Sequence, residues 1–196
     1  MKIKFDSNQD YQLDAIQSFV DLFDGQPLHK EDFAVEFNKE ILKGQTSLFQ
    51  TELGIGNNLV IDNETLLKNL HIIQERNDIE ETSPEEFSKN GLNFSAEMET
   101  GTGKTYVYLR TIFELSQKYG FKKFIIVVPS VAIREGALSN IDLTSDHFKA
   151  LYNNIEFEYF VYDSKKTNRI RQFASSNQIQ IMIINIDAFN KETNIF

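Results

Sequence analysis

Residues 97–105 read EMETGTGKT, a run that is typical of a phosphate-binding loop. Gly101 and Gly103 allow the backbone to turn tightly and to present a row of N–H groups to an anion. The side chain of Lys104 is placed to reach the β- and γ-phosphates of a nucleotide, and the hydroxyl of Thr105 to hold Mg²⁺. A helix that begins here would direct the positive end of its dipole at the same anion.

The sequence on either side of the loop predicts the strand and the helix that such a loop requires. Residues 94–98 alternate between apolar and polar side chains as in a strand, and residues 106–119 carry an apolar helical face that ends at Gly120. The next run, residues 124–128, is apolar and β-branched, as in a buried parallel strand. The strict loop pattern has glycine where this chain has Met98. The alternative interpretation is a glycine-rich turn ahead of an ordinary core helix.

Composition is that of an ordinary globular chain, with 196 residues of which 41% are hydrophobic and 25% charged. This length suits one domain, or one domain and a part of another. No apolar run reaches the roughly 18 residues of a membrane span, and the N-terminus lacks the apolar core of a signal peptide, so we expect a cytoplasmic protein without a membrane partner. Zero cysteines exclude disulfides and thiolate metal sites, and the three histidines show no metal-ligand spacing.

The net charge of −9 is unevenly distributed along the chain. Residues 1–97 hold 8 Lys/Arg and 19 Asp/Glu, a net charge of −11, whereas residues 98–196 hold 12 and 10, a net charge of +2. An acidic chain is a poor candidate for strong nucleic-acid binding by itself. Any contact with nucleic acid is therefore expected on the second half.

Ahead of the loop the pattern is mainly helical. Apolar residues recur at helical spacing over residues 9–23 and again over residues 63–76. The run Ser83-Pro84-Glu85-Glu86 is a capping box that opens a further short helix. Residues 28–62 show no clear pattern. We therefore expect residues 1–92 to form a leading helix followed by a mainly helical insertion.

Behind the loop strands and helices alternate, and residues 93–196 are predicted to form an α/β core. The expected elements are strands at 156–162 and 178–186, a helix from Thr144 or Ser145 to about residue 153, and a helix over 165–174. Alternation at this spacing predicts a parallel sheet with helices on both faces. The phosphate-binding loop would then lie at the carboxyl-terminal edge of that sheet.

The loop and its flanks, Phe94 to Thr111, resemble the Walker A segment of superfamily 2 helicase motors. The longer run EMETGTGKTYVY is similar to one branch, the Res subunit of type III restriction-modification enzymes, in which Met98 is normal. Residues 126–136 resemble the next motif of that family and residues 183–190 a later one. Tyr11-Gln12 with Ala15-Ile16 resembles its upstream Gln motif. The resemblance implies a P-loop NTPase fold with a RecA-like sheet.

The resemblance also implies roles for individual residues, with ATP and Mg²⁺ as cofactors. Lys104 and Thr105 would be catalytic, and the Thr105 hydroxyl would hold the metal. Nucleotide contacts would come from Gln12, Thr100, Gly101, Thr102, Gly103, Lys104 and Thr105, with Gln12 reading the adenine edge. Ser130 and Arg134 would lie along the nucleic-acid track. The alternative interpretations are a solvated surface residue for Gln12 and a salt-bridged surface residue for Arg134.

By this resemblance the chain is the N-terminal ATP-binding part of a DNA-translocating restriction subunit. The whole subunit would hydrolyse ATP, act on double-stranded DNA and cleave it together with a methyltransferase (modification) subunit. Hydrolysis also needs a Walker B carboxylate. The sequence contains no Asp followed directly by Glu, so we expect the motor lobe to be truncated before Walker B and this chain to bind nucleotide at most. The alternatives are a small P-loop nucleotide kinase and a non-catalytic remnant that serves as an interaction module.

Overall fold

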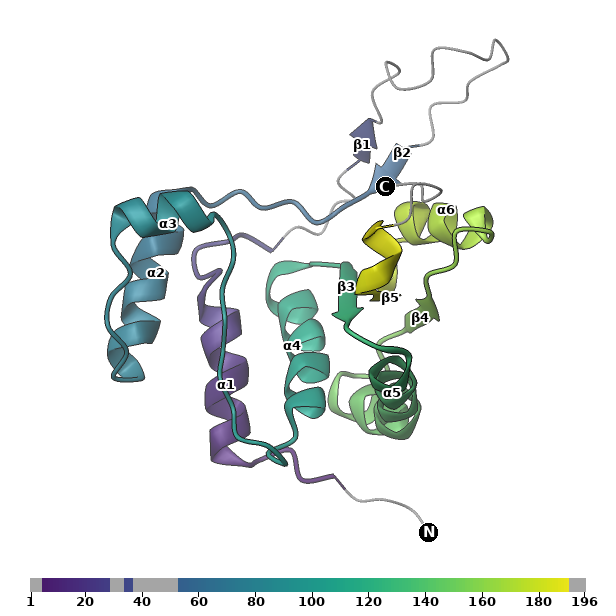
Figure 1. Ribbon diagram of the computed structural model, residues 1–196, viewed down its shortest axis with the longest axis horizontal. Coiled ribbons are helices and arrows are strands. Elements are labelled where there is room, and N and C mark those ends of the chain that lie inside the picture. The colour runs from purple at the N-terminus through teal and green to yellow at the C-terminus, as the bar shows by residue number, and fades with distance from the viewer. Residues whose placement is uncertain (1–4, 29–33, 37–52, 191–196) are drawn as a thin grey trace.

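The structure is a computed structural model, and it describes residues 5–28, 34–36 and 53–190 (Figure 1). In chain order its elements are α1 (Asp10–Asp21), β1 (Ala34–Glu36), β2 (Leu53–Ile55), α2 (Asn63–Arg76), α3 (Pro84–Asn90), α4 (Lys104–Tyr119), β3 (Lys123–Val128), α5 (Val131–Leu151), β4 (Phe157–Val161), α6 (Thr167–Ser175), β5 (Ile179–Asn185) and the 3₁₀ helix η2 (Ile186–Asn190). Within these ranges no helix has the length and apolar character needed to span a lipid bilayer.

The main sheet has three parallel strands in the order β3-β5-β4. Central strand β5 is buried at six of its seven positions, and all of these except Gln180 are apolar, as expected for a strand covered on both faces. Isoleucines of β5 face α4 and α5, whereas on the opposite face Phe160 of β4 makes an edge-to-face ring contact with Phe173 of α6. The predicted α/β class with a parallel sheet is therefore confirmed.

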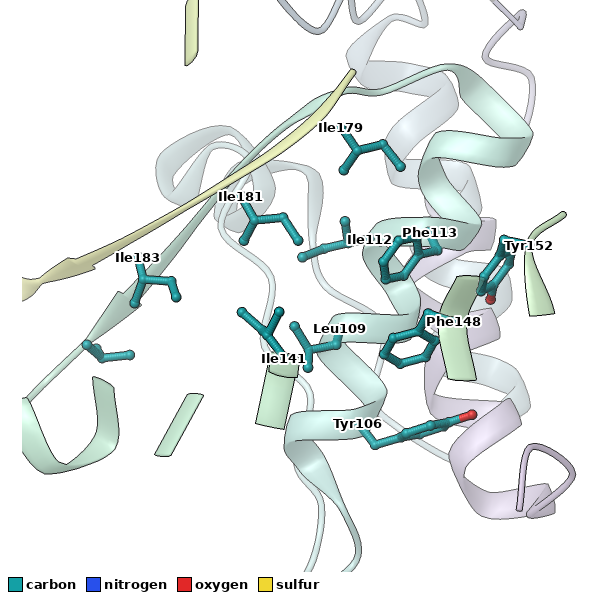
Figure 2. Close-up of a cluster of buried hydrophobic side chains, with 11 residues drawn as sticks. Tyr106, Leu109, Ile112, Phe113, Ile141, Phe148, Tyr152, Ile179, Ile181 and Ile183 are labelled. Atoms are coloured by element: carbon teal, nitrogen blue, oxygen red, sulfur yellow. The ribbon is translucent and has the colours of Figure 1, made fainter. Parts of the chain in front are cut away.

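The core between the sheet and helices α4 and α5 fixes the position of α4 (Figure 2). Phe113 lies at its centre, with its ring centroid 4.8 Å from that of Phe148 and 5.1 Å from that of Phe157. Ile181 and Ile183 of β5 are fully buried in the same cluster. Burying each such side chain stabilises the fold by roughly 1.5–3 kcal/mol, so the helix that follows the loop is held firmly on the sheet.

Helix α1 packs on the side of α4 that faces away from the sheet (Figure 1). Its buried stripe, Ile16 and Val20, contacts Val107 and Tyr119 of α4. The Tyr119 hydroxyl also donates a 2.9 Å hydrogen bond to the Val20 carbonyl. The predicted amphipathic helix is confirmed, and its apolar face is directed at α4.

Helices α2 and α3 form where the sequence predicts them. Asp62 caps α2 by accepting a 2.8 Å hydrogen bond from the Thr65 N–H, and Ser83 caps α3 by accepting one of 3.2 Å from the Glu86 N–H. Residues 34–36 and 53–55 form the antiparallel pair β1-β2, in a region that the sequence left unassigned. The rest of residues 29–52 lies outside the described residues.

The strand expected at Phe94–Met98 is wrong, because these residues are extended but pair with no strand among those described. Figure 1 shows the segment running along α1 instead. Phe94 packs with Leu66 and Phe87, and Met98 packs against the α1 stripe. A β-strand requires hydrogen bonds to the backbone of a neighbouring strand. The alternating side chains of residues 94–98 pack against helices instead.

The helix start expected at Thr144 or Ser145 is also wrong. One helix, α5, runs from Val131 to Leu151 and is capped by Ser130. Thr144 lies in its interior, where its buried hydroxyl donates a 2.7 Å hydrogen bond to the Asn140 carbonyl one turn earlier. A residue type that favours helix starts is thus satisfied inside a helix.

Candidate functional site

The loop ahead of α4 has the backbone of an anion-binding turn. Gly101 and Gly103 adopt left-handed conformations with φ of 86° and 83°, and Gly103 is the N-cap of α4. The Glu99 carbonyl closes the turn by accepting hydrogen bonds from the Thr102 hydroxyl at 2.7 Å and from the Thr102 N–H at 3.5 Å. The first turn of α4 therefore directs its unpaired N–H groups and positive dipole end into the loop.

Lys104 is bound to the loop itself. Its ammonium donates hydrogen bonds of 2.9 Å to the Met98 carbonyl and 2.7 Å to the Glu99 carbonyl, and the side chain is exposed. These neutral carbonyls are weaker partners for an ammonium than a phosphate would be. Thr105 follows in the first turn of α4, and burial raises the pKa of the nearby Tyr108 hydroxyl, an effect that Thr105 partly offsets.

Gln12 lies against this loop although 90 positions separate it from its partner. Its side-chain amide, on a residue only 7% exposed, donates a 2.9 Å hydrogen bond to the Thr102 carbonyl. A Cβ added at Gly103 would lie 2.6 Å from the Gln12 Nε2 atom, a distance that real side chains do not tolerate. The expected return of Gln12 to the loop is confirmed, whereas its recognition of adenine stays a prediction.

A groove of about 1020 Å³ adjoins the loop between α1, α2 and residues 93–99. Its walls include Tyr11 and Asp14 of α1, Ile73 of α2, and Met98 and Thr102 beside the phosphate-binding turn. The volume is at the upper end of that of ordinary small-molecule sites. The extended path of residues 94–98 along α1 thus leaves an open space next to the loop.

Ser130 and Arg134 lie at the carboxyl ends of the strands. The Ser130 hydroxyl caps α5 by accepting a 3.3 Å hydrogen bond from the Ile133 N–H. Arg134 forms a 2.8 Å ion pair with neighbouring Glu135 and a 3.5 Å contact with the side chain of Asn185 at the end of β5. These bonds join the two residues to α5 and β5 rather than to the phosphate-binding loop. These contacts agree with the alternative interpretation of Arg134 as a salt-bridged surface residue.

Arg110, two turns into α4, is a buried charge that the sequence reasoning missed. Its guanidinium donates to the Ser7 carbonyl at 2.6 Å and to the Tyr152 hydroxyl at 3.3 Å, and it pairs with Glu114 at 3.5 Å. The Tyr152 hydroxyl donates to Glu114 at 2.6 Å, and burial together with this carboxylate raises the pKa of Tyr152. The i, i+4 spacing of Arg110 and Glu114 within an apolar helix was the available signal.

Comparison with protein families places almost the whole chain in one group. The family model described as type III restriction enzyme, res subunit, matches residues 7–195. The EcoPI Res subunit of Escherichia phage P1 is 30% identical over 164 residues, which are 83% of this chain and 15% of that protein. The StyLTI Res subunit of Salmonella typhimurium is 41% identical over 115 residues, 50% of this chain and 12% of that protein.

A third relative, the EcoP15I Res subunit of Escherichia coli, is 34% identical over 110 residues, 55% of this chain and 11% of that protein. The three relatives are described as Res subunits of type III restriction-modification enzymes, and none is a nucleotide kinase. The chain spans between 11% and 15% of their length.

Proposed function

Because this chain belongs to the family of type III restriction enzyme Res subunits, we propose that it is the ATP-binding N-terminal part of the first motor lobe of such a subunit. The observation that carries the proposal is the loop of left-handed glycines at the start of α4, with Lys104 across it and Gln12 bonded behind it. The parallel sheet beneath α4 supports a RecA-like lobe.

In this proposal the backbone N–H groups of residues 100–103 would hold the phosphates of ATP. Lys104 exchanges the Met98 and Glu99 carbonyls for phosphate oxygens, which are stronger acceptors for its ammonium. Thr105 would hold a Mg²⁺ ion through its hydroxyl, and the ion would neutralise charge on the phosphates. Gln12 presents its amide to the adenine edge, and the groove beside Tyr11 supplies room for the nucleoside.

The division of the chain follows from the same proposal. Residues 93–196 would form the α/β core of the lobe, and residues 1–92 the Gln-motif helix with a mainly helical insertion. This division is supported by α2, which packs through Leu66 on Leu22 near the end of α1, and by Arg76, which forms a 2.9 Å ion pair with Asp21. The insertion would therefore brace the helix that carries Gln12.

The whole subunit would couple ATP hydrolysis to movement on double-stranded DNA and to DNA cleavage, acting in the cytoplasm with a modification subunit. Ser130 and Arg134 lie at the carboxyl end of the strands, where DNA phosphates would bind. The Arg134–Glu135 ion pair lies at the surface, where the Glu135 side chain is 60% exposed. Surface ion pairs contribute little to stability, so Arg134 would lose little free energy on exchanging Glu135 for a phosphate. Within this chain the proposed activity is nucleotide binding.

The test is a titration of the chain with a fluorescent ATP analogue in the presence of Mg²⁺. We expect Lys104→Ala to weaken binding at least tenfold, because a charge-assisted contact is lost. Lys118→Ala is the matched control, since Lys118 lies on the same helix but pairs with Asp21 and Asp24 at its far end. Equal affinity of Lys104→Ala and the unchanged chain would refute the proposed site.

Hydrolysis provides a second measurement on the same proteins. We expect release of inorganic phosphate from ATP at no more than the background rate, with or without DNA, because the sequence contains no Asp followed directly by Glu, as a Walker B segment would have. Turnover that Lys104→Ala abolishes would show that another carboxylate of this chain serves the metal.

A further inference from the structure

Residues 5–9, here called the N-terminal strap, cross from α5 to the start of α1. The Ser7 carbonyl accepts the 2.6 Å hydrogen bond from Arg110, and the Phe5 ring stacks on Tyr106 with centroids 6.2 Å apart and lies 5.3 Å from His147. Gln9, the N-cap of α1, makes no side-chain capping bond. The start of α1 is therefore held by contacts of the strap with α4 and α5 rather than by a local cap.

Arg110 is a buried donor whose side chain is held in place for its bond to the Ser7 carbonyl. The residue is 9% exposed, and Glu114 and the Tyr152 hydroxyl hold its guanidinium from the other side. A buried ion pair is often replaceable by apolar residues of similar volume without loss of stability. Packing of the core therefore gives little reason for a charged residue at position 110. A charged donor that reaches a backbone carbonyl, in contrast, forms a strong and directional hydrogen bond.

The strap leads directly to Gln12. The N–H groups of Gln12 and Leu13 both donate 3.0 Å hydrogen bonds to the Gln9 carbonyl, so the end of the strap and the first turn of α1 form one unit. Gln12 in turn donates to the Thr102 carbonyl of the phosphate-binding loop. Arg110 lies on α4, the helix that begins directly after that loop. Helix α4, through Arg110 and the strap, and the loop ahead of it, through the Thr102 carbonyl, therefore hold Gln12 from two directions.

We propose that Arg110 is a positioning residue, which anchors the N-terminal strap through the Ser7 carbonyl and thereby holds Gln12 against the phosphate-binding loop. Its consequence for base recognition depends on the proposed function, whereas the anchoring itself does not. The structure also contains a matched bond at the other end of α1, where the Tyr119 hydroxyl donates 2.9 Å to the Val20 carbonyl. That bond joins α4 to α1 itself and lies far from Gln12 along α1.

The experiment compares Arg110→Met, Phe5→Ala and Tyr119→Phe with the unchanged chain. Hydrogen–deuterium exchange is measured at residues 7–13, and competition titrations give the affinities for ATP, GTP and inorganic tripolyphosphate. We expect Arg110→Met to speed exchange at residues 7–13 about tenfold, as for loss of a charge-assisted bond, and Phe5→Ala to act in the same direction. Tyr119→Phe should leave these residues unchanged.

Nucleotide affinities separate positioning from general weakening. Arg110→Met should reduce the ratio of ATP to GTP affinity several-fold while tripolyphosphate binds as before, because the loop remains and Gln12 is misplaced. Equal exchange at residues 7–13 in Arg110→Met, Phe5→Ala and the unchanged chain would overturn the anchoring. Faster exchange with an unchanged ATP to GTP ratio would overturn the link to Gln12. An unchanged chain that binds neither nucleotide would instead refute the proposed function, and the exchange data would still decide the anchoring.

Discussion

The close approach of Gln12 to the phosphate-binding loop predicts an unequal cost for two similar substitutions, Gly101→Ala and Gly103→Ala. Both glycines have left-handed backbones, with φ of 86° and 83°. A methyl group at either position adds the same backbone strain, roughly 1–2 kcal/mol. At Gly101 the added Cβ meets nothing within 4 Å, whereas at Gly103 it would lie 2.6 Å from the Gln12 Nε2 atom.

The second substitution therefore carries an additional cost. Gln12 is a flexible side chain, so its amide moves away and loses the bond to the Thr102 carbonyl. Losing that bond on a residue only 7% exposed costs about 1 kcal/mol. We expect Gly101→Ala to lower the free energy of unfolding by roughly 1–2 kcal/mol and Gly103→Ala by roughly 2–3 kcal/mol.

Urea unfolding followed by circular dichroism measures both values, and a double-mutant cycle isolates the contact. In a Gln12→Ala background the additional cost should disappear, so that Gly101→Ala and Gly103→Ala become equal. The reasoning is refuted if the two substitutions cost the same in the unchanged chain, or if their difference persists after Gln12 is removed.

Three further predictions concern the core, a histidine and DNA. Phe113→Ala should lower the free energy of unfolding by about 3–5 kcal/mol in denaturant titrations, since the side chain is 1% exposed, whereas Ile72→Ala, at a site 53% exposed, should stay within about 0.5 kcal/mol. Burial, together with the charge of Arg110, lowers the pKa of His147, so the unfolded chain binds more protons. Stability should fall as the pH drops from about 6.5 toward the lower folded pKa, and His147→Gln should flatten that part of a pH series of unfolding curves. Duplex DNA should bind weakly and in a salt-sensitive manner because the net charge is −9, and a nanomolar Kd by anisotropy at physiological salt would contradict this.

Elements whose signals are local could be predicted from the sequence. The apolar periodicity of α2 and the capping box of α3 predict those helices, and both form. The glycine loop, the amphipathic α4 and Gly120 at its end also follow from neighbouring residues, as does the apolar strand β5. Capping, backbone conformation and helical periodicity act within a few residues, so they can be recognised without the rest of the chain.

Elements that need a distant partner could not be predicted in the same way. Residues 94–98 alternate like a strand, yet they lie along α1 because Phe94 and Met98 find apolar partners on helices. Thr144 has the side chain of a helix start, but Phe148 and Ile141 around it are buried in one continuous helix. Alternation and capping propensity describe what a segment is able to form, and packing selects among the possibilities.

The candidate site likewise combines residues that the local sequence predicts with residues that only the packing of distant segments brings together. The motif at residues 97–105 predicted a glycine loop suited to phosphate binding and pointed to the family, because its glycines, lysine and threonine lie within five neighbouring positions. The resemblance also led us to expect Gln12 near the loop, but only the tertiary structure identified its partner, the Thr102 carbonyl. The spacing of Arg110 and Glu114 could have indicated a charged pair, but only the fold showed that Arg110 contacts the Ser7 carbonyl, 103 positions away. A contact between residues so far apart depends on how α1, α4 and the sheet pack together, and no local pattern of residues encodes that packing.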